Sequence, residues 1–96
     1  MPAALSEFSL IDRFFARRAA QGARASTLGI GDDCALIAPR SGKLLAISTD
    51  MLVEGRHFFP DVAPDALGHK TLAVNLSDLA AMGAEPRAFT LACALP

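Results

Sequence analysis

The most regular pattern of hydrophobic and polar positions in this chain lies between residues 64 and 83. Its apolar members recur at the three- and four-residue spacing of one helical face: Leu72, Leu76 and Leu79. A polar stripe repeats that spacing one residue earlier: Thr71, Asn75 and Asp78. Asp61, Pro64 and Asp65 suit the start of a helix, Gly83 suits its end, and Pro86 prevents it from resuming. The pattern therefore predicts one long helix that ends at Gly83.

Asp78 is an unexpected residue on a helix so rich in alanine and leucine. Burial of a carboxylate costs several kcal/mol unless a partner compensates its charge. A metal ion is one candidate partner, and simple exposure of Asp78 to water is equally consistent with the helix alone.

The N-terminal segment predicts a second helix. Ser6 is a suitable cap, Glu7 lies at the positive end of the helix dipole, and Gly22 is a plausible stop after Gln21. A loop around Ala25 to Leu28 is expected to follow this helix.

The rest of the chain predicts strands, a turn and a loop. Apolar or alternating runs indicate three strands: 36–38, 44–49 and 88–95. Ser41 and Gly42 mark a hairpin turn between the first two strands. Residues 51–60 show no clear period, which indicates a structured loop. The predicted class is α/β (α+β).

Oxygen-bearing side chains gather at the ends of these elements. Ser48, Thr49 and Asp50 close the second strand, and Asp32 and Asp33 follow Gly29 and Gly31. Glycines beside paired acids allow close approach of a ligand, although Gly-Asp-Asp is also ordinary turn chemistry. If these acids converged with Asp78 they would repel one another, so cations would have to neutralise them. Such ligands suit Mg²⁺.

His57 lies in the predicted loop. A histidine there can orient a phosphate or a substrate, and it can equally serve the loop structure alone. Its position does not decide between these roles.

Composition narrows the class of protein. The 96 residues are 52% hydrophobic and 20% charged with a formal net charge of -1, which favours one small domain with a modest core and indicates neither disorder nor a nucleic-acid surface. No apolar run approaches the roughly 20 residues of a membrane span. Cys34 and Cys93 lack metal-ligand spacing, so we expect free, buried thiols in a cytoplasmic protein.

Three ordered motifs resemble the thiamine-monophosphate kinases: Gly29–Ala35, Ser48–Phe58 and Lys70–Ala84. The chain has no Walker A sequence, kinase glycine loop or dinucleotide fingerprint. The resemblance implies an N-terminal ATP-binding domain of the aminoimidazole ribonucleotide synthetase-like type, with a mixed or antiparallel sheet and packed helices. It also implies that this domain forms a homodimer.

The resemblance also implies the chemistry. ATP would phosphorylate thiamine monophosphate to thiamine diphosphate by direct in-line transfer, with no residue assigned as a catalytic group. Several Mg²⁺ ions would be held by Asp33, Ser48, Thr49, Asp50 and Asp78, with Asp32 and Asn75 as secondary candidates. The three acids Asp33, Asp50 and Asp78 would bind the nucleotide through these ions, and His57 would contact the substrate.

Members of that family are several times longer than this chain. We therefore expect residues 1–96 to be a partial N-terminal domain without the C-terminal domain, and to be inactive alone. Two alternatives stay open: a sibling ATP-using enzyme, such as a selenophosphate synthetase or a hydrogenase-maturation factor, and a non-catalytic dimerisation fragment.

Overall fold

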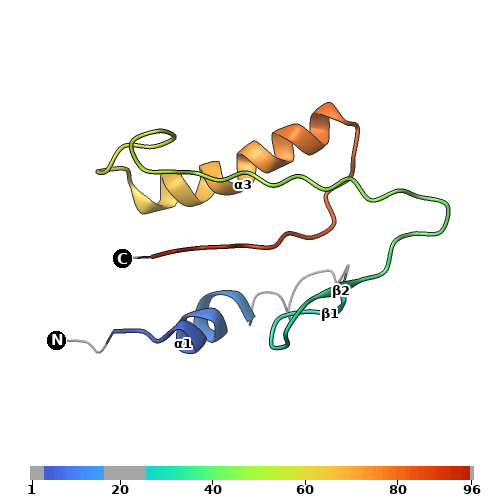
Figure 1. The fold of residues 1–96 in the computed structure, drawn as a ribbon, viewed down its shortest axis with the longest axis horizontal. Helices are drawn as coiled ribbons and strands as arrows, with labels where there is room; N and C mark the ends of the chain where they lie inside the picture. Colours follow the sequence, from blue (N-terminus) through green and yellow to red (C-terminus); the bar gives the residue numbers. More distant parts are fainter. Residues whose placement is uncertain (1–3, 17–25, 96) are drawn as a thin grey trace. The chain divides into compact units, whose positions relative to one another are not determined.

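The computed structural model describes residues 4–16 and 26–95 (Figure 1). They fall into two compact units. The first unit contains Met1–Gly42 and Ala88–Pro96, and the second contains Lys43–Arg87.

The first unit begins with helix α1, Glu7–Ile11. Ser6 caps it as predicted, because its side-chain oxygen accepts a hydrogen bond of 3.2 Å from the backbone N–H of Ser9. The helix predicted from Glu7 continues past Ile11 as a π-helical segment, η1, at Asp12–Ala16. The predicted stop at Gly22 lies outside the described residues.

Two short strands form an antiparallel pair in the first unit. They are β1, Ser26–Leu28, and β2, Leu36–Ile37. The second was predicted, whereas residues 26–28 were wrongly expected to be loop. Strand β1 offers only three residues, too few to show a period of two, so the antiparallel pairing decides its state.

The other two predicted strands do not form. Residues 44–49 in the second unit and residues 88–95 in the first carry no strand assignment. Gly42 does form a turn with φ +71°, but the chain leaves this turn without a hairpin partner. Alternation indicates an extended backbone, while a strand also needs a neighbour to bond to. The mixed sheet expected from the resemblance is therefore limited, among the described residues, to β1 and β2.

Helix α3, Pro64–Ala81, dominates the second unit and confirms the main prediction (Figure 1). Proline occupies its first turn, where a missing N–H has no helical partner to lose. At the end of the helix Gly83 has φ +65°. The N–H of Gly83 donates to the carbonyl of Ala80 at 3.0 Å, and the N–H of Ala84 donates to the carbonyl of Leu79 at 2.9 Å. This paired bonding is a Schellman motif, which explains why the helix ends at a glycine.

An extended segment, residues 43–52, runs beside α3, and a loop joins the two (Figure 1). The loop is ordered by backbone hydrogen bonds, as the absence of a period predicted. Gly55 donates to the carbonyl of Phe58 at 2.8 Å, and His57 donates to the carbonyl of Val53 at 2.9 Å. Gly55 has φ +81°, which favours glycine at this turn.

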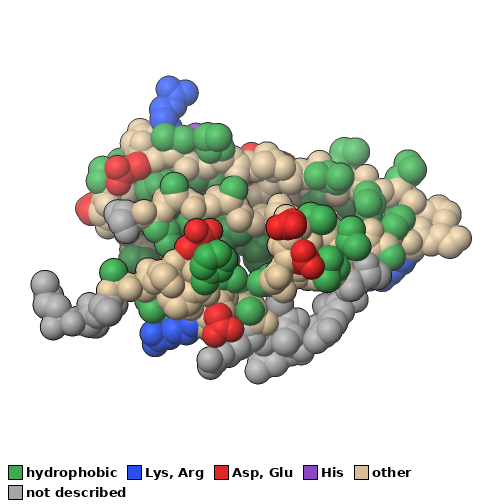
Figure 2. Space-filling model, turned by 60° about the horizontal axis from the view of Figure 1, so that its bottom comes forward, with side chains coloured by type: hydrophobic (Ala, Val, Ile, Leu, Met, Phe, Trp, Pro, Cys, Tyr) green, Lys and Arg blue, Asp and Glu red, His purple; other side chains and the backbone are tan. Residues whose placement is uncertain are grey.

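Large hydrophobic side chains remain exposed in both units. No described side chain is buried, and Leu44 and Ile47 of the extended segment are 98% and 85% exposed. Hydrophobic side chains appear at many separate places on the surface in Figure 2. The predicted modest core is therefore absent from the described part of the chain, and the expectation of buried thiols was wrong, because Cys34 and Cys93 are free but exposed.

Among the described residues, none of the helices combines the length and apolar character that crossing a membrane requires.

Candidate functional site

The structure brings three of the predicted site residues together in the second unit. The hydroxyl of Ser48 lies 3.5 Å from Oδ1 of Asn75 and 3.4 Å from Oδ2 of Asp78. Both separations are long for O–H···O hydrogen bonds, so the single hydroxyl proton is shared weakly between two acceptors. Ser48 reaches the helix from the extended segment, which places a hydroxyl, an amide oxygen and a carboxylate within one small region.

The orientation of the Asn75 amide is set by its own helix. Its Nδ2 donates to the carbonyl of Thr71 at 3.0 Å, while the Thr71 hydroxyl donates to the carbonyl of Leu67 at 2.7 Å. Because the amide nitrogen is used in this way, the oxygen of Asn75 faces Ser48. The polar stripe predicted on this helix is thus an ordered network, and Asp78 at its end is exposed to solvent as well as bonded to Ser48.

Asp50 lies two residues beyond Ser48 on the same extended segment. It lines a cavity of about 110 Å³ together with His57 and with Lys70 and Val74 of α3. Residues two apart on an extended chain project to the same side, which agrees with Ser48 and Asp50 both meeting α3. Thr49 lies between them and is exposed.

His57 is held at two points by its loop and by α3. Its Nδ1 accepts a hydrogen bond of 2.9 Å from the backbone N–H of Val53, and its backbone carbonyl accepts one from Nζ of Lys70. The ring and the backbone of this residue are therefore fixed separately.

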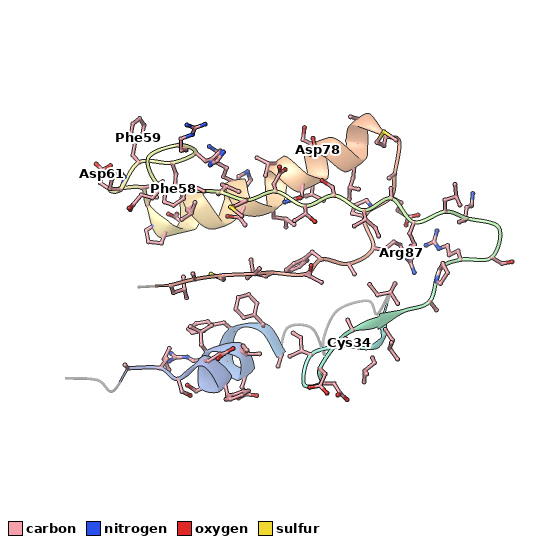
Figure 3. All side chains as sticks on the ribbon, in the orientation of Figure 1. Cys34, Phe58, Phe59, Asp61, Asp78 and Arg87 are labelled. Atoms are coloured by element: carbon pink, nitrogen blue, oxygen red, sulfur yellow. The ribbon has the colours of Figure 1, made fainter. Side chains whose placement is uncertain are left out.

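A larger cavity of about 350 Å³ lies between this loop and the start of α3. Its wall combines the cationic groups of Arg56 and Lys70 and the His57 ring with apolar side chains, including Phe58, Phe59 and others from the loop and helix. Figure 3 shows Phe58 and Phe59 on the loop that precedes α3. The volume falls at the small end of the range typical of ligand sites.

Asp32 and Asp33 lie in the first unit, in the turn between β1 and β2. The Asp32 carboxylate accepts a 2.9 Å hydrogen bond from the backbone N–H of Asp33. This bond gives Asp32 a local role in the turn. The convergence of this pair with Asp50 and Asp78 stays a prediction, because the two pairs belong to different units.

The oxygen groups around Ser48 fit a magnesium ion in chemical type. Hydroxyl, amide and carboxylate oxygens are the hard ligands that Mg²⁺ takes, usually one or two carboxylates with substrate phosphates and water. Within the described ranges, no three histidine, cysteine or acidic side chains are grouped closely enough to hold a metal by themselves. The second unit thus presents part of a ligand set.

The contact between Lys70 and His57 was not predicted from the sequence, because its acceptor is a backbone carbonyl, which carries no residue-type signal. The cavity beside the loop was not predicted either, because its apolar wall comes from residues without periodic spacing.

Residues 31–96 match the family described as AIR synthase related protein, N-terminal domain. The chain belongs to this family. The matched region contains Asp32, Asp33 and the whole second unit, so every predicted site residue falls within it.

Curated relatives extend the similarity to nearly the whole chain. It is 57% identical over 94 residues to a protein of Escherichia coli (strain K12), 47% identical over 93 residues to one of Haemophilus influenzae, and 40% identical over 93 residues to one of Mycobacterium tuberculosis. Each is named thiamine-monophosphate kinase, and each alignment covers 96–97% of this chain. The chain spans only 27–28% of the length of these relatives.

No solved structure matches the chain significantly.

Proposed function

We propose that this chain is the N-terminal, ATP- and Mg²⁺-binding part of a kinase that phosphorylates thiamine monophosphate to thiamine diphosphate. The observation that carries the proposal is 57% identity, over 97% of the chain, to a protein named thiamine-monophosphate kinase. In this proposal residues 1–96 form a partial N-terminal domain of a cytoplasmic homodimer, and the 96 residues alone are inactive.

The proposal assigns roles to the site residues. Ser48, Thr49, Asp50 and Asp78 hold Mg²⁺ from the extended segment and α3, and Asp33 does so from the turn before β2. Asp32 and Asn75 are secondary ligands, although the hydrogen bonds of both side chains within the protein favour a positioning role. His57 contacts thiamine monophosphate at the cavity it lines.

The reaction is a direct phosphoryl transfer. A phosphate oxygen of thiamine monophosphate attacks the γ-phosphorus of ATP, the bond from that phosphorus to the β-phosphate oxygen breaks, and ADP leaves. When bound, Mg²⁺ neutralises phosphate charge in such a reaction. The protein side chains bind, orient and bring the two substrates together, which is most of what this chemistry requires. No residue of the chain is assigned as a covalent nucleophile.

The direct test is an assay of the complete gene product with ATP, Mg²⁺ and thiamine monophosphate. We expect thiamine diphosphate and ADP in equal amounts from the complete product, and none from the 96-residue chain. Turnover by the 96-residue chain would contradict its assignment as an incomplete part.

The alternative of a sibling ATP-using enzyme, such as a selenophosphate synthetase, is tested in the same assay with selenide as a comparison substrate. A folded product that binds Mg·ATP but leaves thiamine monophosphate unchanged would retain the family and the acidic site, and would reject this substrate.

A further inference from the structure

We propose that Lys70 is a positioning residue that presents His57 to the substrate in a single tautomer, as a hydrogen-bond donor through Nε2. The inference rests on the proposed function, in which His57 contacts thiamine monophosphate, and it adds both a second residue and the direction of the hydrogen bond.

A hydrogen bond joins the middle of the loop to helix α3. Nζ of Lys70 donates to the backbone carbonyl of His57, thirteen residues earlier in the chain. This bond ties the middle of the loop to α3, whose two ends are fixed by Pro64 and by the Schellman motif at Gly83. A hydrogen bond from a charged donor is stronger than one between neutral groups. Lys70 therefore holds the middle of the loop to the helix.

The hydrogen bond at Nδ1 fixes the tautomer of the neutral His57 ring. The backbone N–H of Val53 donates to Nδ1 of His57 at 2.9 Å. A backbone N–H is only a donor, so Nδ1 has to be the nitrogen without a proton, and the neutral ring carries its proton on Nε2. The reciprocal bond from the His57 N–H to the Val53 carbonyl, at 2.9 Å, closes this turn and holds the ring over it.

His57 can be reached by a ligand from two cavities. His57 and Lys70 line both the cavity of about 350 Å³ and the cavity of about 110 Å³ that contains Asp50. With Nδ1 engaged by Val53, Nε2–H is the ring group left to meet a bound molecule. Its partner has to be an acceptor atom, such as a phosphate oxygen of the substrate.

Steady-state kinetics of the complete gene product test the role of Lys70. We expect Lys70→Met to raise the KM for thiamine monophosphate roughly tenfold, the effect of losing one charged hydrogen bond, with little change in kcat or in the KM for ATP. Lys70→Arg retains a charged donor and should recover most of the loss. Lys43→Met removes the same charge outside both cavities and should leave KM unchanged.

A double variant separates positioning from direct contact. If Lys70 acts through His57, Lys70→Met adds little to the effect of His57→Ala. Fully additive effects, or a loss confined to the KM for ATP, would overturn the proposal.

The tautomer is tested without turnover. Nitrogen-15 NMR of histidine-labelled protein, with the His57 signals assigned by their loss in His57→Gln, should show His57 protonated at Nε2 in the wild type and, because the Val53 N–H sets the tautomer, in Lys70→Met as well. A wild-type ring protonated at Nδ1 would overturn the proposal even in an active enzyme. An Nε2 proton in a protein that ignores thiamine monophosphate would instead reject the substrate and leave the tautomer standing.

The side chain that replaces His57 gives a further check. Glutamine places its amide nitrogen near the position of Nε2, whereas asparagine places it near Nδ1. We expect His57→Gln to bind thiamine monophosphate several-fold more tightly than His57→Asn, and the reverse order would contradict donation from Nε2.

Discussion

Ser48 meets Asn75 and Asp78 across 27 and 30 residues of chain, which makes this group the best-defined polar cluster of the second unit. Asn75 is turned by its bond to Thr71, and Asp78 is the one charged member. We expect removal of that charge to weaken cation binding while leaving the shape of the cluster nearly unaltered, so that an effect on binding can be told apart from an effect on folding.

We expect Asp78→Asn to weaken Mg²⁺-dependent ATP binding by the complete gene product at least roughly tenfold, because changes around a metal site commonly cost that much or more. Calorimetry with Mg·ATP measures the loss, and circular dichroism should show an unchanged fold since Asp78 is exposed. Asp61→Asn is the matched control, because it removes the same charge from the loop before α3 (Figure 3). Equal affinities for wild type and Asp78→Asn would refute the ligand role.

The types of the site residues were predictable from the sequence, but their neighbours were not. Ser48 and Asp50 were proposed as ligands from hydroxyl and carboxylate groups at the end of a predicted strand, and Asp78 from a carboxylate on a helix rich in alanine and leucine. Their grouping depends on how the extended segment lies along α3, and spacing does not report that. The Lys70 contact was hidden for a further reason, since any residue offers the same carbonyl.

At the scale of elements, local signals succeeded wherever the structure is held by local bonds. Ser6 caps α1, proline begins α3 and Gly83 ends it, and in each case the deciding hydrogen bonds or dihedral angles lie within a few residues. The strand predictions at 44–49 and 88–95 failed because pairing is not local. The π-helical turn after Ile11 had no sequence signal.

The end of α3 gives a prediction with a built-in comparison. Gly83→Ala should destabilise the helix by about 1 kcal/mol, because φ +65° is costly for a residue with a side chain. Gly68→Ala, inside the same helix, should stabilise it by up to about 1 kcal/mol. A Cβ at either position has no atom within 4 Å, so crowding does not confuse the comparison.

Thermal unfolding of the 96-residue chain at equal, dilute concentration, followed by far-ultraviolet circular dichroism, measures both effects. Shifts of the same sign for the two variants would contradict the left-handed cap at Gly83.

At the scale of the whole molecule, the balance of apolar and polar surface is unusual. The chain is 52% hydrophobic, yet no described side chain in either unit is buried. Single exposed hydrophobic residues are ordinary, but many together favour contact with further protein surface. The residues with the largest exposed fractions include Leu44, Ile47, Phe59 and Phe8.

We therefore expect the 96-residue chain to associate in solution and to bind a hydrophobic dye strongly. Light scattering over a dilution series should give masses above the 10.0 kDa of one chain at the higher concentrations. Leu44→Gln combined with Ile47→Gln should reduce both association and dye binding, whereas Ser41→Gln, on the preceding turn, should not. A concentration-independent monomer with little dye binding would contradict this prediction and the dimerisation module as well.

The two hydrogen bonds donated by Ser48 affect which ions can approach its hydroxyl oxygen. Its hydroxyl hydrogen is drawn toward α3 by Asn75 and Asp78, so the lone pairs of Oγ are left on the opposite side. An oxygen arranged in this way repels an approaching anion and attracts a cation. The helix thus leaves the Ser48 oxygen as a weakly cation-attracting group, and Asp78 keeps the hydroxyl hydrogen on the side of α3 even where Asn75 is changed.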